Sequence, residues 1–277
     1  MEHYETVILI KRTSEEFFAI MSTVEKVLYL LESNRDKYTS GEEMALQCGV
    51  SRNAVWKAIR ELKNRGYDID AISNKGYRLS ETNNIISAEG IRAHLRETEK
   101  ARYDISVYDT LESTNDKAKV LAMKGATHGT VVVATRQSGG RGRKDHSFFS
   151  PEGGLYFSII LKPESLPYTD SSKLTRLVSS AVSESIHELT GISTYVEGIN
   201  DLYVDSKKIC GILIESGSEF DSGILQWIVA GIGINFDSNI EDFPEEIRDR
   251  AASLFAPGKA TITKNELIAS IIQRIIG

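Results

Sequence analysis

The chain has 277 residues, of which 41% are hydrophobic and 26% charged, and its formal net charge is −6. This composition is typical of a globular protein with room for two domains, and it excludes a disordered or fibrous chain. No apolar run reaches the roughly 18 residues of a membrane-spanning helix, and the N-terminus lacks a secretory leader, so we expect a cytoplasmic protein with no membrane partner. Cys48 and Cys210 lack the spacing of metal ligands or of a disulfide framework, so we expect two buried thiols and no metal site.

Residues 1–21 match neither of the domains that follow, and we interpret them as an N-terminal extension. From residue 24 to 31 apolar residues recur at intervals of three and four, which predicts a helix. A second, short helix is expected after Ser40, with Glu43 completing a capping box. A third begins after Ser51 and ends at Gly66. We therefore predict a winged helix-turn-helix domain over residues 22–81, in which the third helix contacts DNA.

The predicted third helix is basic: residues 51–65 contain five Lys or Arg side chains against one acid. The two segments 67–72 and 77–79 read as short strands joined by a polar turn, which predicts the wing. Arg78 is also expected to reach phosphates from this hairpin. The side chains expected to face DNA are Ser51, Arg52, Asn53, Trp56, Lys57, Arg60 and Lys75.

Residues 81–84 are polar and lack an apolar period, and we place the domain boundary there, followed by a second domain over residues 85–277. Its predicted elements are a helix near 87–96, a strand at 105–108, a helix at 114–123, strands at 130–134 and 155–161, a helix at 171–189, strands at 209–215 and 227–234, and a helix from 264. Because hairpins as well as helices connect the strands, we predict a mixed sheet in an α+β domain.

The segment from Gln137 to Lys144, QSGGRGRK, follows a predicted strand. Glycines let a backbone approach a ligand closely, and Arg141 and Arg143 supply planar cations suited to carboxylates and phosphates. The segment matches neither the P-loop nor the dinucleotide-binding pattern. It predicts an anion-binding loop, and a solvated basic surface loop is the alternative interpretation.

Three further segments carry polar or glycine-rich patterns. Ser113-Thr114-Asn115 stands where a strand ends and a helix begins, which is also the ordinary position of a helix cap. Asn200-Asp201 precedes a predicted hairpin that returns through Lys208 and Gly211. The segment 231–235, GIGIN, has glycines that allow a ligand to lie against a strand end.

In this order and spacing, the four segments resemble the biotin protein ligases, and with the N-terminal domain they resemble the bifunctional members that repress biotin operons. The resemblance runs from about residue 23 to the end of the chain. It implies a class II synthetase-like ligase domain that joins biotin to ATP, with Mg²⁺, to give biotinyl adenylate (biotinyl-AMP). Biotin then passes to a lysine of a biotin carboxyl carrier protein. The resemblance also implies operator DNA as a partner and a homodimer.

The resemblance implies site residues position by position. Three cations are expected to be catalytic: Arg141, Arg143 and Lys208. The implied cofactor-binding positions are Ser113, Thr114, Asn115, Gln137, Gly140, Gly142, Phe148, Gly153, Gly154, Asn200, Asp201, Gly211 and Asn235. Among these, Ser113, Thr114 and Gln137 would read the ureido ring of biotin, and Phe148 would take the place of a tryptophan that stacks on adenine.

Three features depart from the family pattern. Glu197 stands where the family has a lysine before Asn-Asp, and at roughly 4 kcal/mol per charge pair about 4 Å apart this exchange opposes adenylate formation by several kcal/mol. His146 replaces another basic residue. The chain stops at Gly277, whereas the family continues into a small β domain, which we expect to be absent. These departures predict weak or lost ligase activity.

Two functional hypotheses follow. The first is a biotin ligase that also represses transcription in response to biotin. The second is a ligand-sensing DNA-binding regulator that has lost the ligase chemistry, as Glu197 would suggest. A ligase for a related acid such as lipoate is a third interpretation, and the winged helix argues against it.

Overall fold

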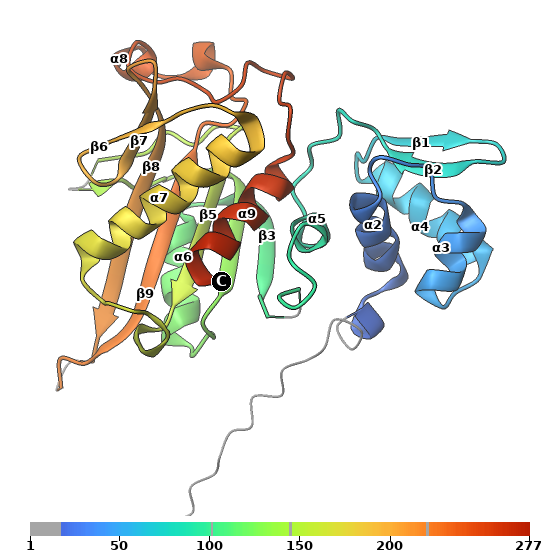
Figure 1. The fold of residues 1–277 in the computed structure, drawn as a ribbon, viewed down its shortest axis with the longest axis horizontal. Coiled ribbons are helices and arrows are strands. Elements are labelled where there is room, and N and C mark those ends of the chain that lie inside the picture. The colour runs from blue at the N-terminus through green and yellow to red at the C-terminus, as the bar shows by residue number, and fades with distance from the viewer. Residues whose placement is uncertain (1–17, 101, 144–145, 220–221) are drawn as a thin grey trace, which may run out of the picture.

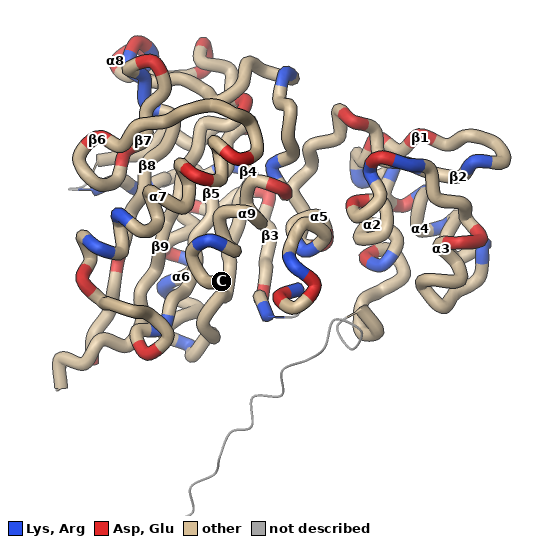
Figure 2. The backbone as a smooth tube through the Cα atoms, in the orientation of Figure 1, with Lys and Arg blue, Asp and Glu red and all other residues tan. Residues whose placement is uncertain are grey.

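The computed structural model describes residues 18–100, 102–143, 146–219 and 222–277, and these form two domains that lie side by side (Figure 1). We call the predicted anion-binding loop that begins at Gln137 the glycine-arginine loop. Most of the predicted extension, residues 1–17, and residues 144–145 at the end of this loop lie outside the described part. Lys, Arg, Asp and Glu are interspersed over both domains (Figure 2). Across the described residues, no helix is both long and apolar enough to span a bilayer.

The N-terminal domain is the predicted winged helix-turn-helix. Its elements are α2 (Thr23–Ser33), α3 (Gly41–Cys48), α4 (Arg52–Asn64), β1 (Ile69–Ile72) and β2 (Gly76–Leu79). Ser40 and Ser51 cap α3 and α4 as expected, but the reciprocal capping box lies one helix earlier, between Ser22 and Glu25. The apolar faces of the helices and of the hairpin meet in one buried core that includes Leu31, Leu62 and Leu79.

The second domain is built on a seven-stranded mixed sheet, as predicted, in the order β3-β4-β5-β9-β8-β7-β6. Its strands are β3 (Ile105–Leu111), β4 (Thr130–Gln137), β5 (Leu155–Leu161), β6 (Tyr195–Glu197), β7 (Asp201–Val204), β8 (Lys207–Ser218) and β9 (Leu225–Ile234). Its helices are α5 (Ala88–Ala93), α6 (Thr114–Met123), α7 (Ser171–Thr190), α8 (Glu245–Arg248) and α9 (Lys264–Ile276), with short 3-10 turns at Pro163–Ser165 and Ile240–Asp242. Among the seven strands described, only β3 and β4 pair in parallel.

Helices cover both faces of this sheet. Val131 and Val133 of β4 point into the large core beneath α7 and α9, and Val132 between them points into a smaller core beneath α6. All seven residues of β5 are buried, which explains why the strand is apolar apart from Ser158. Cys48 and Cys210 are buried free thiols, as the sequence predicted. The sheet is thus packed between α7 and α9 on one face and α6 on the other. This packing fixes the positions of the start of α6 and of the ends of β4 and β9, where the polar motifs lie.

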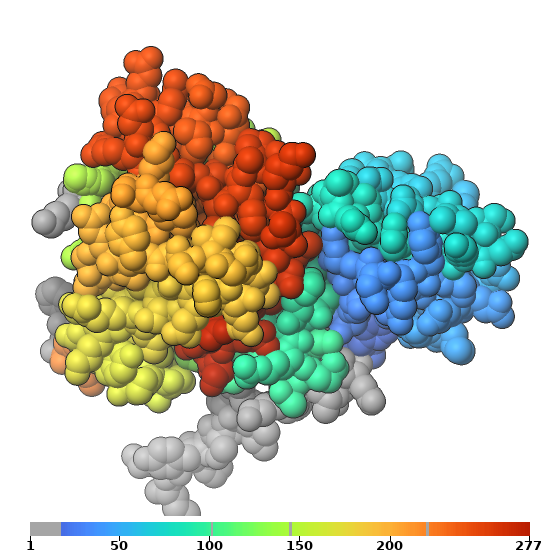
Figure 3. Space-filling view, turned by 45° about the horizontal axis from the view of Figure 1, so that its top comes forward, coloured from blue at the N-terminus to red at the C-terminus, as the bar shows by residue number. Residues whose placement is uncertain are grey.

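The two domains share a buried polar contact. Glu32 of α2 is 2% exposed, and its carboxylate accepts hydrogen bonds from Arg35 at 2.9 Å and from Asn265 of α9 at 3.3 Å. Asn265 also accepts a bond from the backbone of Ser87 and donates to the backbone of Ile85. Figure 3 shows the N-terminal domain in continuous contact with the larger domain. The winged helix is therefore fixed to the larger domain by α9.

Arg35 is expected to stabilise this contact because it is the cation paired with Glu32. Burial raises the pKa of Glu32 above its usual 4.5, although Arg35 opposes the shift. The folded state therefore binds this proton more tightly than the unfolded chain, and the contribution of Glu32 to stability falls as the pH rises through the raised pKa. Arg35→Met should lower the free energy of unfolding by roughly 3 kcal/mol at pH 8, since the buried carboxylate loses its partner.

The loss in Arg35→Met should be smaller at pH 5, where the carboxyl can be protonated, and urea unfolding at both pH values measures it. Arg65→Met is the control, because Arg65 pairs with Glu61 in a contact where both side chains are at least half exposed. It should change the free energy by less than about 1 kcal/mol. Equal losses in the two variants, or a loss in Arg35→Met that does not vary with pH, would contradict the prediction.

Candidate active site

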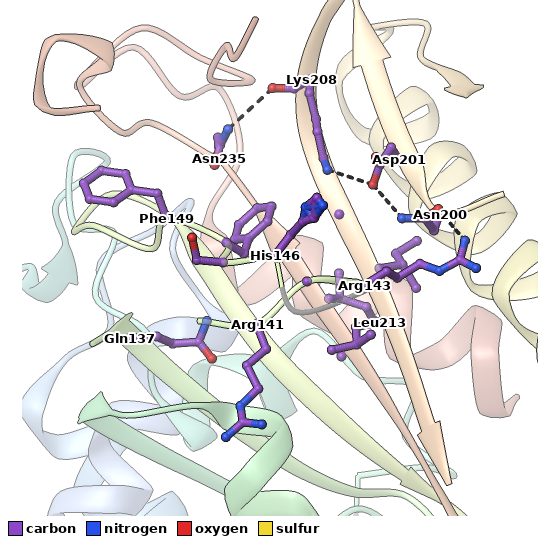
Figure 4. A pocket seen from close by; sticks show the side chains of 18 of the residues that line it. Gln137, Arg141, Arg143, His146, Phe149, Asn200, Asp201, Lys208, Leu213 and Asn235 are labelled. Atoms are coloured by element: carbon purple, nitrogen blue, oxygen red, sulfur yellow. Dashed lines mark hydrogen bonds and ion pairs between the residues drawn. The ribbon is translucent and has the colours of Figure 1, made fainter. Parts of the chain in front are cut away.

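A cavity of about 560 Å³ opens where α6 begins and β4 ends. Its walls come from the start of α6, the glycine-arginine loop, the middle of β8 and β9, the start of β7 and residues 243–251 (Figure 4). The four motifs of the sequence, which span residues 113–235, all contribute to this one cavity. The predicted positions that line it are Ser113, Thr114, Asn115, Gln137, Arg141, Gly142, Arg143, Phe148, Asn200, Asp201, Lys208, Gly211 and Asn235.

Glycines on β8 and β9 form the floor of the cavity. A Cβ at Gly231 would lie 2.1 Å from Oδ1 of Asn115, and a Cβ at Gly233 would lie 2.7 Å from the ring of Phe148. A Cβ at Gly211 on the neighbouring strand would lie 3.0 Å from that ring, which is tight. Real Cβ atoms do not make contacts as short as those at Gly231 and Gly233, so the Asn115 and Phe148 side chains lie directly on the sheet because those positions lack side chains.

Hydroxyl and amide groups at the start of α6 form one hydrogen-bonded cluster. Gln137 Oε1 accepts bonds from the backbone N–H of Thr114 at 2.8 Å and from its hydroxyl at 3.1 Å. Gln137 in turn donates to the hydroxyl of Ser150 at 3.0 Å. Ser113 accepts from the backbone of Asp116, so it caps the helix as well as lining the cavity. The orientation of the Gln137 amide is thus fixed before any ligand arrives.

Ser158, at the centre of β5, completes this cluster and was not predicted. Its hydroxyl is fully buried and lies 2.8 Å from Oγ1 of Thr114 and 2.6 Å from Oδ1 of Asn115. A serine within an otherwise apolar strand, LYFSIIL, is the signal that was available in the sequence.

A chain of polar contacts runs along the opposite wall (Figure 4). Arg143 donates to Oδ1 of Asn200 at 3.1 Å, and Asn200 donates to Asp201 at 2.7 Å. Lys208 forms an ion pair with Asp201 at 2.8 Å. Arg250, which the sequence did not indicate, lines the same cavity. Cationic side chains therefore gather here, which suits a ligand that carries negative charge.

Glu197 lies outside this cavity. It ends the exposed edge strand β6, and within the described residues the cavity lining does not include it. Its carboxylate accepts a hydrogen bond from Tyr203, whose pKa is raised to about 12, mainly by burial and then by this bond. The charge reversal expected at the anion site is therefore not seen at the cavity wall, where Lys208 and Arg250 supply positive charge.

Gly140, Gly153 and Gly154 are the predicted positions that do not line the cavity. A Cβ at Gly140 would lie 2.3 Å from the carbonyl oxygen of Phe148, and one at Gly154 would lie 1.9 Å from the Tyr156 hydroxyl. Gly153 has a φ of 88° and packs against Ser238. In this structure these glycines permit close packing beside the cavity.

Several lining residues were missed by the sequence analysis. They are Ser147, Phe149, Tyr203, Ile212, Leu213, Phe243, Ile247, Arg250 and Ala251. Ile212 and Leu213 continue the Gly211 motif, so they had a signal. Residues 243–251 had none, because their place depends on contacts such as the edge-on packing of Phe149 against Phe243, with ring centroids 5.2 Å apart.

Asn235 has a buried acceptor without a partner in the described structure. Its Nδ2 donates to the carbonyl of Ala252 at 3.0 Å, but its buried Oδ1 has no hydrogen bond. A buried carbonyl oxygen that loses water without gaining a donor destabilises the fold. A donor on a ligand in the cavity would satisfy it.

The residues predicted to contact DNA are exposed on α4 and at the wing. Ser51, Arg52, Asn53, Trp56, Lys57, Arg60 and Lys75 all have exposed side chains. Arg60 lies over the ring of Trp56, with its guanidinium carbon 5.5 Å from the centroid. Arg78 differs from the expectation, since it pairs with Asp70 at 3.1 Å within the hairpin and is one-quarter exposed.

Comparison with known proteins agrees with this architecture. Residues 107–235 match the biotin/lipoate A/B protein ligase family, and residues 23–78 match a helix-turn-helix domain. The chain is 38% identical to the bifunctional ligase/repressor BirA of Bacillus subtilis, over 92% of this chain and 77% of that protein. It is 28% identical to BirA of Escherichia coli, over 92% and 76% of the two chains.

Among solved structures, the biotin protein ligase of Aquifex aeolicus in complex with biotin and ATP superposes with a TM-score of 0.53. The superposition covers 62% of this chain and 68% of that one, at 32% identity. The fold is thus that of a biotin/lipoate ligase domain joined to a winged helix-turn-helix. The chain belongs to the family of bifunctional ligase/repressor proteins.

Gly231→Ala should disturb this site through the fold itself. The added Cβ would displace the buried Asn115 amide, and overpacking of this kind lowers the free energy of unfolding by roughly 1 to 3 kcal/mol. Gly41→Ala is the control, since its Cβ would meet its nearest neighbour, in Tyr77, at an ordinary 3.5 Å. Chemical denaturation of both variants tests the prediction, and wild-type stability in Gly231→Ala would show that the glycine is dispensable.

Proposed function

We propose that this chain activates biotin with ATP, transfers it to a lysine of a biotin carboxyl carrier protein, and represses transcription at an operator. The observation that carries the proposal is the single cavity that joins the Thr114–Gln137 cluster to the cations Arg143 and Lys208. The relative in Bacillus subtilis, a bifunctional ligase/repressor, supports the same pair of activities. The reaction would take place in the cytoplasm, where ATP and carrier proteins are found.

The cavity fits biotin and ATP by size and by chemistry. Its volume of about 560 Å³ lies within the range of small-molecule sites. The hydroxyl of Thr114 and the amide of Gln137 offer donors and acceptors for a ureido ring. The unpaired Oδ1 of Asn235 would accept a hydrogen bond from the amino group of adenine, and Phe148 presents an aromatic ring nearby.

The chemistry requires two anions to meet. The biotin carboxylate attacks the α-phosphorus of ATP, the bond to the leaving pyrophosphate breaks, and a lysine amine of the carrier later attacks the acyl carbon and releases AMP. Lys208 and Arg143 would hold the two anions together and stabilise charge that develops as they react. Mg²⁺ would enter with ATP. Because the polar contacts among Arg143, Asn200, Asp201 and Lys208 already exist, little reorganisation is needed.

Lys208→Met tests the ligase activity. With biotin, Mg²⁺-ATP and a carrier domain, we expect the wild type to label the carrier and the variant to be slower by roughly 100-fold, the typical loss of one charge-stabilising group. Lys207→Met is the matched control, because Lys207 is adjacent, exposed and absent from the cavity wall as described. An unlabelled carrier with the wild type, under conditions in which a known ligase labels it, would refute the activity.

Glu197→Lys tests the alternative of a regulator without ligase chemistry. Since Glu197 is exposed and outside the cavity, the substitution should change the labelling rate by less than about fivefold. A large gain of activity would instead show that the wild-type carboxylate blocks catalysis.

For DNA binding, we propose that α4 enters the major groove, and that two copies pair as a homodimer on a two-fold operator. Arg52→Ala and Lys57→Ala should each weaken binding and reduce the salt dependence of log K by about one unit for each phosphate that the variant no longer neutralises. Lys259→Ala, at an exposed position in the ligase domain, should leave both quantities unchanged. Fluorescence anisotropy over a range of salt concentrations measures them, and an unaltered slope in Arg52→Ala and Lys57→Ala would remove those side chains from the interface.

A further inference from the structure

The two arginines of the glycine-arginine loop have different partners. Arg141 forms an ion pair with Asp116 in the first turn of α6, with 3.0 Å between Nε and Oδ2. Arg143 instead donates to the neutral amide of Asn200, and among the described residues it has no carboxylate partner. Figure 4 shows the two side chains pointing in different directions, with only Arg143 directed toward Asn200.

Asp116 belongs to a network of four charges. Its Oδ1 accepts from Lys119 at 2.8 Å, and Lys119 also contacts Glu215 of β8 at 2.8 Å. Burial alone would lower the pKa of Lys119, but its bonds to Asp116 and Glu215 raise it, so the lysine stays charged. Glu215 also accepts from Asn115 at 2.8 Å. Two carboxylates and two cations therefore cancel, and Arg141 has already been neutralised within the protein.

Backbone hydrogen bonds and the ion pair of Arg141 both hold the loop. Gly139 donates from its N–H to the carbonyl of Glu112 at 2.9 Å, which fixes the start of the loop. Two residues further on, the backbone of Arg141 bridges to Ser147 while its side chain is bound to α6. Arg143 follows after one more residue. The charge of Arg141 is balanced by Asp116, whereas Arg143, bound to a neutral amide, keeps its full charge.

We propose that Asp116 is a positioning residue for the ligand-binding loop: it binds Arg141 and so holds residues 139–143 in place. The inference rests on the proposed function for its ligand, in which Arg143 contacts the phosphate of the acyl adenylate. Asp116 acts through Arg141 and does not touch the ligand.

The test follows the release of biotinyl adenylate. The adenylate is formed on the enzyme from radiolabelled biotin and Mg²⁺-ATP, and its dissociation is measured in a chase with unlabelled biotin. Asp116→Asn and Arg141→Met should each speed release by roughly two- to fivefold, the range expected for a partly exposed ion pair. The double variant should be no faster than either single one, because both remove the same contact.

The rate of adenylate formation at saturating substrate separates positioning from direct contact. Asp116→Asn should keep the wild-type rate, whereas Arg143→Met should lose rate at saturation because it removes a phosphate contact. The matched control is Glu184→Gln, which breaks the exposed ion pair with Arg274 on the far side of α7 and should leave release unchanged. Wild-type release by Asp116→Asn, or effects that multiply in the double variant, would overturn the inference.

A second measurement needs no ligand. Hydrogen exchange in the free protein should be faster over residues 139–143 in Asp116→Asn than in the wild type, while peptides from α7 exchange at the same rate in both. Unchanged exchange at residues 139–143 would refute the inference even if the wild type formed no adenylate. A wild type without adenylate would by itself refute the proposed ligase activity, so the two failures can be told apart.

Discussion

The cavity depends on three positions where the sheet has no side chain. At Gly211, Gly231 and Gly233 the backbone of β8 and β9 is in direct contact with the side chains of Asn115 and Phe148. A methyl group at Gly231 would overlap the side chain of Asn115 and disturb its hydrogen bonds, and one at Gly211 or Gly233 would crowd the ring of Phe148. The polar cluster at the start of α6 therefore depends on the lack of side chains at these glycine positions of β8 and β9.

On both walls of the cavity, a cationic side chain forms an ion pair with a carboxylate. Lys208 has Asp201 and Arg141 has Asp116, so neither cation is left without compensation when the cavity holds only solvent. The pairs are partly exposed, and each contributes little to the stability of the fold. Their value is geometric, since each fixes the direction of a long flexible side chain. The wall remains positive where Arg143 has an amide partner and where Arg250 joins the lining.

The sequence predicted the parts of this protein whose requirements are local. The caps at Ser40 and Ser51 and the hairpin of the wing each need particular residues at fixed spacing, and they were found where expected. The three-residue strand β6 is exposed at every position and so carried no alternating pattern. Arg250 and Phe243 were missed because residues 235–263 contain little regular structure and are placed by distant contacts.

Two interpretations from the sequence differ from the structure because a sequence motif does not specify which way a residue faces in the fold. Gly140, Gly153 and Gly154 were assigned to the ligand, but each faces protein atoms at distances that exclude a side chain. Glu197 occupies the motif position of a lysine, yet it belongs to an edge strand and turns to Tyr203. A sequence motif fixes only the position of Glu197 along the chain. The position of its carboxylate in space is determined by the pairing of β6 with β7.

The contact between Glu32 and Asn265 determines how the DNA-binding helix is aimed. Arg35 also donates to the backbone of Ser80 and Asn83, so the segment between the domains is held along its length as well as at its ends. The connection therefore does not behave as a flexible tether. If two copies sit on one operator, the separation of their recognition helices, about 34 Å for adjacent turns of the double helix, is fixed by how the large domains meet. The permitted spacing of half-sites would then be a property of the ligase domain.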